Sequence, residues 1–247
     1  PFRPSFWRAP TDNDCGAQMQ QKFRLWHDPQ MKLKSLEAKP QGGEMVVAAK
    51  YELPELAAQL ELTYTIDGNG AIEVAEVLTV DPAQKDMPHL FRFGMELTMP
   101  HQYDRICYYG RGPQESYSDR KAAALIGLYT EDVDDQYYPY IRPQESGNKT
   151  DVRYWKQIDR SGRGFEIRSD KPFQASALPY LTADLDDGIE KHQRHSGELT
   201  PRDLVNVHID AVQMGVGGED SWGSWPRPAY RLPYGDYSFR FVLVPIR

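Results

Sequence analysis

Apolar and polar residues alternate along much of the chain, and the pattern is clearest on both sides of residues 67–70. Every second residue is apolar in segment 60–66, the sequence Asp-Gly-Asn-Gly follows, and most alternate positions of segment 72–80 are apolar again. A two-residue period gives a β-strand one apolar face, and Gly with Asn or Asp between two such runs is a strong β-hairpin signal. These residues therefore predict two antiparallel strands joined by a tight turn.

Other parts of the chain show the same two-residue period. Strands are predicted over residues 47–53, 91–99, 205–211 and 237–243. Helical spacing is scarce: it predicts one helix over residues 18–26, with three apolar side chains on one face, and a weaker one over residues 184–191. Because strands joined by hairpins pair antiparallel, whereas parallel pairing needs long crossovers, the pattern predicts an all-β fold of antiparallel sheets packed face to face.

Length and composition favour a single folded unit. The chain has 247 residues, which is long for an average domain but routine for an all-β one. It shows no repeat or low-complexity tract, and its prolines and glycines are dispersed instead of gathered into a linker. We therefore expect one domain over residues 1–247. Because the first residue is Pro1 and not methionine, we also expect a piece of a longer protein.

Charge and hydropathy argue against two classes of partner. The formal net charge of −7 and a pI near 5.4 oppose attraction to phosphate backbones, so no nucleic-acid partner is predicted. No segment approaches the roughly 18 consecutive apolar residues of a membrane helix, so no membrane partner is predicted. Cys15 and Cys107 lack metal-type spacing and are predicted to be free, buried thiols, with one disulfide as the alternative. Two cysteines do not decide between a cytoplasmic and a periplasmic location.

Segment 215–222, with the sequence Gly-Val-Gly-Gly-Glu-Asp-Ser-Trp, follows the predicted strand 205–211. Its three glycines permit sharp turns or the close approach of another group. The flat face of the Trp222 indole can lie on the C–H side of a sugar ring while its N–H donates a hydrogen bond. The alternative is a core tryptophan that closes a hairpin, with Glu219 and Asp220 in water. The residues alone leave both interpretations open.

Acidic residues are candidate catalysts of glycoside hydrolysis. Retention of configuration needs two carboxyl groups about 5 Å apart, one of them with a raised pKa. The sequence contains neighbouring acidic pairs at Asp12 with Asp14, Asp134 with Asp135, Asp186 with Asp187, and Glu219 with Asp220. Each pair is more simply interpreted as a turn, a cap or a solvated group, and adjacent residues of a strand point to opposite faces. No catalytic residue is therefore predicted.

The histidines offer two further candidates. His192 and His195 lie near Glu190, but this polar segment lacks a zinc motif, so a solvated surface is predicted and no metal ligand is assigned. His208 and Asp210 share one face of their predicted strand and are expected in a buried hydrogen-bonded cluster or on a wetted face. They are also the nearest, though poor, match to the histidine acid and carboxylate base that a mutarotase needs.

Two loops are expected to have structural roles. In the loop rich in Gly and Pro that begins at Gly110, Glu115 and Arg120 are predicted to form a buried ion pair that fastens a long connection. The alternative is that this loop supports the rim of an active site. The start of the chain is predicted to be a clasp in which Asp12 and Asp14 accept backbone hydrogen bonds.

Four segments carry a resemblance to a known family. They are Phe6–Asp14, Gly110–Arg120, Tyr138–Arg153 and the Gly-Gly-Glu-Asp-Ser-Trp sequence that ends at Trp222. In order and spacing they resemble the C-terminal, small-chain domain of the large LacZ-type β-galactosidases of glycoside hydrolase family 2. The resemblance covers nearly the whole chain. It implies a large antiparallel two-sheet supersandwich, also used by galactose mutarotases, excised from the C-terminus of a longer multidomain glycosidase.

The same resemblance implies a function for the parent protein, which is hydrolysis of terminal β-D-galactosides with retention. The family's catalytic glutamates belong to an upstream barrel domain, so the isolated chain is expected to be inactive. Trp222 stands at the position of a tryptophan that forms part of the wall for the sugar or its aglycone, which makes it the predicted substrate-binding residue. No cofactor is predicted in this chain, because the family's Mg and Na are held largely by the upstream domain.

The partners that the resemblance implies are the upstream barrel domain of the same protein, a galactoside substrate, and further copies of the parent in a homo-oligomer. Two other functions stay open at this point. One is a free-standing aldose 1-epimerase on the same fold. The other is a noncatalytic carbohydrate-binding domain, for which an exposed Trp222 is the direct support.

Overall fold

The chain forms antiparallel strands and a few short helices. The computed structural model describes residues 2–190, 192, 194–220 and 223–247. Within these residues the strands are β1 (Phe2–Ser5), β2 (Lys32–Gln41), β3 (Glu44–Leu53), β4 (Ala58–Ile66), β5 (Ile72–Val80), β6 (Arg92–Pro100), β7 (Arg105–Gly112), β8 (Leu125–Asp132), β9 (Lys149–Ile158), β10 (Gly164–Leu178), β11 (Leu204–Gln213) and β12 (Tyr237–Ile246). The α-helices are α1 (Asp12–Gly16), α2 (Met19–Lys22) and α3 (Thr182–Leu185). The prediction of an all-β fold with few short helices is confirmed.

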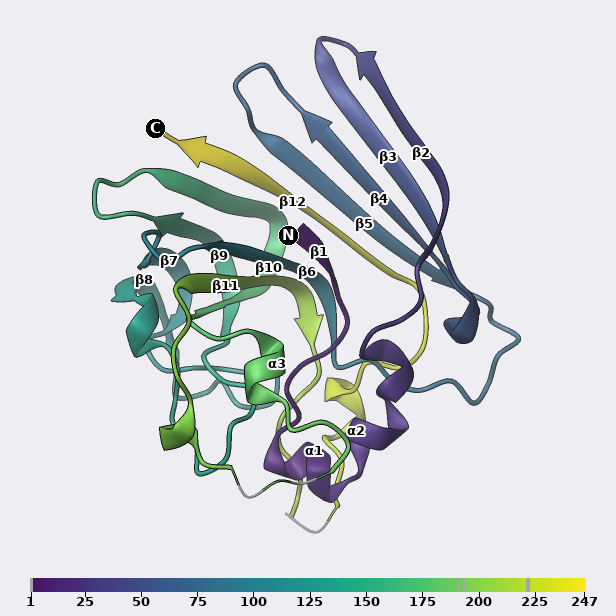
Figure 1. The fold of residues 1–247 in the computed structure, drawn as a ribbon, viewed down its shortest axis with the longest axis vertical. Helices are drawn as coiled ribbons and strands as arrows, with labels where there is room; N and C mark the ends of the chain where they lie inside the picture. The colour runs from purple at the N-terminus through teal and green to yellow at the C-terminus, as the bar shows by residue number, and fades with distance from the viewer. Residues whose placement is uncertain (1, 191, 193, 221–222) are drawn as a thin grey trace.

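The strands form two layers that share one strand, β10. The hydrogen-bonded order is β1-β6-β11-β10-β12-β5-β4-β3-β2, and β10 also pairs with β9, which pairs with β7. Residues 164–168 of β10 pair with β12, whereas residues 174–178 pair with β11. Between these stretches the register against β9 shifts, which marks a bulge where the strand changes layer. In Figure 1, β2 to β5 fan out beside β12, away from β6 and β11.

Aromatic side chains fill the space between the two layers. The Phe2 ring of β1 lies 6.1 Å from the Tyr64 ring of β4 and 6.2 Å from the Phe241 ring of β12. The Phe93 ring of β6 lies 5.4 Å from the Tyr237 ring of β12. Such pairs contribute about 0.5–1.5 kcal/mol each beyond the burial of their area. The predicted antiparallel sheets therefore do pack face to face over a common aromatic core.

The predicted hairpin lies where the sequence places it. β4 pairs with β5 from Ala58↔Val80 to Ile66↔Ile72. In the turn, the Asp67 carboxylate accepts hydrogen bonds from the backbone N–H groups of Asn69 at 2.8 Å and Ala71 at 2.9 Å. The strands predicted over residues 47–53, 91–99, 205–211 and 237–243 correspond to β3, β6, β11 and β12.

The helix predictions were only partly right. Instead of one helix over residues 18–26, the chain forms α2 and then a 3-10 turn at Arg24–Trp26, because Phe23 leaves the helical region with φ −101° and ψ 9°. The predicted apolar face is nevertheless buried. The helix expected over residues 184–191 is wrong for the described residues: α3 ends at Leu185, and Asp186 then accepts a hydrogen bond from Gly188 N at 2.7 Å. This local turn competes with helical hydrogen bonding.

Both cysteines are free, as predicted, but neither is fully buried. Cys15 and Cys107 are each partly exposed. Partial burial is the main cause that raises the pKa of the Cys15 thiol, and Arg142 acts in the opposite direction. Among the described residues, no helix is both long enough and apolar enough to cross a membrane.

Candidate functional site

The four segments that carry the family resemblance come together at one end of the fold. They are far apart in sequence, yet hydrogen bonds join the first to the loop after β11, the second to the same loop, and the third to both of the others. In Figure 1 this end contains α1 and α2, with the C-terminal end of β11 leading toward them. The loop after β11, which begins at Met214, is the candidate functional site.

The Arg8 side chain holds the first two residues of this loop. The side chain is 0% exposed, and its Nε and Nη2 donate to the two carboxylate oxygens of Asp14 at 3.0 and 2.9 Å. The same guanidinium donates to the carbonyl oxygens of Met214 at 2.6 Å and Gly215 at 2.9 Å. Asp14 also accepts from Thr11 N at 2.8 Å as part of a capping box at the start of α1. A bidentate pair with all of these partners holds the loop backbone in one geometry.

The predicted clasp is therefore confirmed for Asp14 and wrong for Asp12. Asp12 accepts from side chains and not from the backbone: from Arg142 Nη1 at 3.0 Å and from Gln144 Nε2 at 3.1 Å. The reason is its position in the first turn of α1, where it faces the segment that follows Tyr140. Asp12 thus ties the first family segment to the third.

Asp119 fixes the same loop from the other side. Its carboxylate accepts from Val216 N at 3.0 Å and Gly217 N at 2.9 Å. The approach is so close that a Cβ built on Gly215 lies 2.3 Å from Asp119 Oδ2, a contact that real Cβ atoms do not make. Asn13 adds a hydrogen bond from Nδ2 to Val216 O at 3.1 Å. The glycine at 215 is therefore required by close approach, one of the two uses that the sequence predicts.

The returning part of the loop packs against the end of α1 and the residue that follows α2. Gly223 adopts φ +108° beside the carbonyl oxygen of Gly16. Trp225 packs its ring edge-on to Phe23 and to His89, with ring centroids 5.4 Å apart in both cases. Trp222 itself lies outside the described residues, so its assignment as the substrate-binding residue stays a prediction. The structure describes the loop up to residue 220 and again from residue 223, and both parts are held by the contacts given above.

Glu115 and Arg120 do form the predicted ion pair, but it is not a buried one. The Arg120 side chain is 51% exposed and that of Glu115 is 11% exposed. Glu115 also accepts from the Tyr140 hydroxyl and from Gly147 N, the latter at 2.8 Å. The pair fastens the second family segment to the third at the surface, where solvent screens it.

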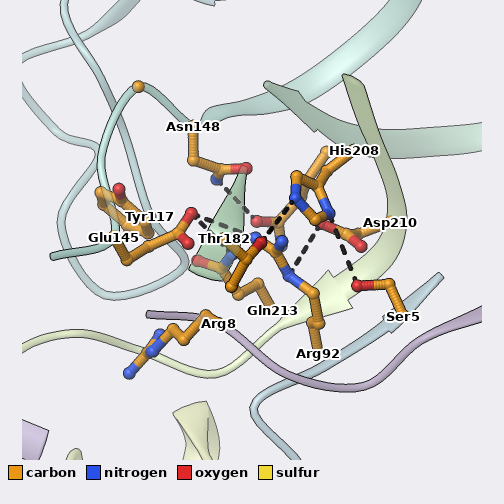
Figure 2. Close-up of polar contacts among 12 residues, drawn as sticks. Ser5, Arg8, Arg92, Tyr117, Glu145, Asn148, Thr182, His208, Asp210 and Gln213 are labelled. Atoms are coloured by element: carbon orange, nitrogen blue, oxygen red, sulfur yellow. Dashed lines mark hydrogen bonds and ion pairs between the residues drawn. The ribbon is translucent and has the colours of Figure 1, made fainter. Parts of the chain in front are cut away.

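A second polar cluster lies on β6 and β11, next to the start of the loop. Figure 2 shows Arg92 between Glu145 and Asp210. Arg92 Nη2 donates to Glu145 Oε1 at 3.1 Å, and Arg92 Nε lies 3.5 Å from Asp210 Oδ2. Gln213 Nε2 also donates to Glu145 Oε1, at 3.2 Å. Burial raises the pKa of Asp210 to about 7, and Arg92 acts against this shift.

His208 belongs to the edge of this cluster. Its ring nitrogens lie 3.5 Å from Ser5 Oγ and 3.3 Å from Thr182 Oγ1 (Figure 2). Burial, and then the charge of Arg92, hold the His208 pKa well below its usual value, so the ring is neutral near pH 7. Of the two environments expected for His208 and Asp210, burial is correct for both, but only His208 is hydrogen-bonded; Asp210 has the 3.5 Å ion-pair contact with Arg92 instead.

The remaining acidic and histidine candidates have ordinary partners. Asp134 lies 3.0 Å from His101 Nε2, and Asp187 pairs with Arg142 at 2.9 Å. His192 and His195 are exposed, as predicted for a solvated surface. Asp186 accepts from Trp7 Nε1 at 2.8 Å. The part of the chain that the structure describes contains no group of three or more His, Cys, Asp or Glu side chains placed to hold a metal ion.

Comparison with known proteins gives one consistent result. The family model described as "Beta galactosidase small chain" matches residues 1–243. The chain is 36% identical over 249 residues to a β-galactosidase of Priestia megaterium, covering 99% of this chain and 23% of that protein. It is 36% identical over 233 residues to a β-galactosidase of Lactobacillus delbrueckii subsp. bulgaricus, covering 92% and 22%. The chain thus spans about a quarter of the length of these curated relatives.

Similar solved structures are more distant. An α-galactosidase from Lactobacillus brevis is 10% identical with a TM-score of 0.49, covering 89% of this chain and 27% of that one. A GalM/aldose epimerase homologue from C. elegans is 10% identical with a TM-score of 0.40, covering 87% and 69%. The description of the fold therefore depends on the strand pairing given above.

Proposed function

Because the chain belongs to the β-galactosidase small-chain family, we propose that it is the accessory C-terminal domain of a retaining β-galactosidase that hydrolyses terminal β-D-galactosides. In this proposal the loop after β11 presents Trp222 to an active site carried by an upstream barrel domain. The indole forms part of the wall for the sugar or its aglycone. The domain assists the reaction and does not cleave the bond.

One observation carries the proposal: the loop backbone is anchored by a buried guanidinium on one side and by a partly buried carboxylate on the other. Arg8 with Asp14 holds residues 214 and 215, and Asp119 holds residues 216 and 217. A binding residue contributes most when its support is rigid before the ligand arrives, because less conformational entropy is then lost on binding. Anchors of this kind favour a loop that serves a ligand over a connection that merely reverses the chain.

The proposal assigns the catalytic glutamates, and the Mg and Na of the family, to the upstream barrel. The partners are that barrel, the galactoside and, in the parent, further copies in a homo-oligomer. In the described part of this chain the acidic side chains near the site already serve as anchors, caps or ion-pair partners, as Asp14, Asp119 and Glu115 do. In this proposal none of them acts as a nucleophile or a general acid.

The first test is activity of the 247-residue chain alone. We expect it not to hydrolyse a nitrophenyl β-galactoside above background, because no catalytic carboxyl pair is assigned to it. Release of nitrophenol is followed by absorbance, with the buffer blank and an intact β-galactosidase as references. Turnover that copurifies with the folded chain would refute the accessory role.

The second test is Trp222→Ala in an intact β-galactosidase that carries this chain. Aromatic stacking contributes about 0.5–1.5 kcal/mol beyond burial, which corresponds to a rise in KM of roughly two- to tenfold. Trp222→Phe keeps an aromatic face and is the matched control, so its KM should stay near that of the parent. Equal KM values for the parent and Trp222→Ala would remove the stacking role while leaving the family assignment intact.

A free-standing aldose 1-epimerase is not supported by the geometry. Such an enzyme needs an accessible histidine acid and a carboxylate base. His208 and Asp210 are both buried, and His208 makes its contacts with Ser5 and Thr182. The carbohydrate-binding alternative shares the sugar chemistry of the main proposal and would require affinity without the barrel.

A further inference from the structure

A cleft of about 910 Å³ lies beside β8, between the loop that follows β7 and the segment that precedes β9. Its lining consists of residues 113–115, 119–124, 130–131, 135–138, Tyr140 and Lys149. Three of these residues are tyrosines at positions 137, 138 and 140, and we call this cleft the tyrosine cleft. Its volume falls within the range of roughly 300–1,000 Å³ typical of small-molecule sites.

The walls of the tyrosine cleft are held in place before any ligand binds. One wall is the loop that follows β7. Within it, Gln114 Nε2 donates to Ala123 O at 2.8 Å and so joins the two ends of the loop. In the second wall, Tyr138 N donates to Ser146 Oγ at 2.9 Å. The two walls meet where Glu115 accepts from the hydroxyl of Tyr140. The cleft is therefore a preformed concavity with a fixed shape.

The charges that line the cleft are compensated within the protein. Their partners are Arg120 for Glu115, Asp151 for Lys121, Glu131 for Lys149, and the backbone N–H groups of Val216 and Gly217 for Asp119. The remaining charged residue, Asp135, is exposed to solvent. Four carboxylates and three cations line the cavity, and each of the three cations is already paired with a carboxylate, so the lining does not select a phosphate. It is suited to a neutral ligand.

Among the described residues, two buried acceptors of the lining have no hydrogen bond, and one of them, Glu131 Oε2, has only the ion-pair contact with Lys149 Nζ at 3.5 Å. Within the residues that the structure describes, neither Glu131 Oε2 nor Gln136 Oε1 accepts a hydrogen bond. Lys149 has three N–H donors, and its two neighbours are the carbonyl of Pro113 and Glu131, the latter at 3.5 Å. Buried polar atoms of this kind are normally satisfied by a ligand or by ordered water. A ligand with several hydroxyl groups can donate to both acceptors and accept from Lys149.

An aromatic face completes the site. Tyr138 is 58% exposed, and its ring lies 4.7 Å from the Tyr140 ring at an angle of 54°. An exposed tyrosine ring beside buried acceptors combines an apolar surface for C–H groups with partners for hydroxyls. We propose that the tyrosine cleft binds a neutral mono- or disaccharide, with the sugar ring against Tyr138 and its hydroxyls on Glu131, Gln136 and Lys149.

This proposal goes beyond the function proposed above and does not depend on Trp222. Asp119 lines the cleft and also holds the backbone of residues 216–217, so an occupied cleft lies next to an anchor of the candidate loop.

The experiment titrates the 247-residue chain with galactose and with lactose, using saturation-transfer NMR. A cooperative thermal melt first establishes that each variant is folded.

We expect saturable binding of one sugar per chain. Tyr138→Ala should weaken it by about three- to tenfold, since a stacking contact is lost. Tyr109→Ala is the matched control, because Tyr109 is a partly exposed tyrosine on β7 that does not line the cleft; its affinity should equal that of the unchanged chain. Inorganic phosphate should not compete with the sugar.

Three results would overturn the proposal: no saturable binding of either sugar, binding that Trp222→Ala abolishes while Tyr138→Ala leaves it intact, or displacement of the sugar by phosphate. If the chain alone does not melt cooperatively, equilibrium dialysis of an intact β-galactosidase carrying it replaces the titration. There Tyr138→Ala should weaken the binding of galactose at one site per chain by the same factor of about three to ten. Failure of the Trp222 proposal appears instead as an unchanged KM, so the two failures are distinguishable.

Discussion

Two buried clusters of charged residues in this protein are built in opposite ways. Around Arg8 and Asp14, hydrogen bonds link the guanidinium to both carboxylate oxygens and to two backbone carbonyls. Around Arg92 and Asp210, the ions face each other at 3.5 Å, and within the described chain both Asp210 oxygens and two Arg92 nitrogens have no hydrogen-bond partner. The residue types are the same, but the satisfaction of their polar atoms differs.

This difference in hydrogen bonding gives the two buried ion pairs different roles. Fully hydrogen-bonded charges fix a geometry, and the loop after β11 depends on that geometry. Poorly hydrogen-bonded charges shift toward neutrality: the pKa of Asp210 is raised to about 7, and that of Glu76 is raised well above its usual value, by burial first and Asp210 second. The first cluster is therefore expected to set structure, and the second to set the pH dependence of stability.

The largest expected effect comes from Asp14→Ala. It leaves the Arg8 charge buried without its partner and removes the capping box of α1. Breaking a buried pair in this way costs about 3–5 kcal/mol of unfolding free energy. Urea denaturation measures the loss. The control is Glu61→Ala in the exposed Lys50–Glu61 pair, which should cost no more than about 1 kcal/mol; equal losses in the two variants would contradict the distinction between satisfied buried pairs and surface pairs.

The next effect is the pH dependence at Asp210. Its folded pKa of about 7 lies above the ordinary value of 3.8, so the folded state keeps a proton that the unfolded state releases between these values. The unfolding free energy should therefore fall as pH rises from about 4 to 7, by roughly 2–4 kcal/mol from this group at 1.36 kcal/mol per unit. Asp210→Asn should remove that part of the slope.

His208 acts in the opposite direction and must be separated from Asp210. Its folded pKa lies well below 6.5, so the unfolded state binds the extra proton and stability falls as pH drops below the unfolded value. Because His208 is present in both proteins, the difference between the parent and Asp210→Asn cancels its contribution. Denaturant curves at several pH values give this difference. A pH-independent difference would show that Asp210 does not titrate in this range.

The smallest of the three effects is expected at the contact between Gly215 and Asp119. Gly215→Ala places a Cβ against the carboxylate and should cost about 1–3 kcal/mol through overpacking. Gly68→Ala is the control, since nothing lies within 4 Å of a Cβ at that position. Adding Asp119→Ala to Gly215→Ala relieves the clash, so the two losses should be less than additive. Simple additivity would mean that the two residues are not in contact.

How much of this could be predicted from the sequence depends on how local the signal is. The β4–β5 hairpin is encoded by a turn and two alternating runs that are adjacent in the chain, and it was predicted correctly. Arg92 lies between the apolar residues Phe91 and Phe93, so alternation alone places it on the exposed face of its strand. It is fully buried because the segment that contains Glu145 covers that face. Only the tertiary contact reveals this burial.

Asp119 shows the same limit at the candidate site. It lies within a segment that carries the family resemblance, but its partners are 97 and 98 residues away and share no local pattern with it. Glu76, by contrast, left a signal in the sequence. It occupies an apolar position in the alternation of segment 72–80, and a charged residue on a buried face is a sign of a polar cluster. The resemblance singled out four segments, and the structure shows that they contact one another at one end of the fold.

One strand belongs to both halves of the sandwich, because β10 pairs with β12 along its first residues and with β11 along its last. Because the two halves share this strand, they cannot separate without breaking its hydrogen bonds to β11 or to β12. Melting should therefore proceed as a single cooperative transition, in which neither half survives the loss of the other.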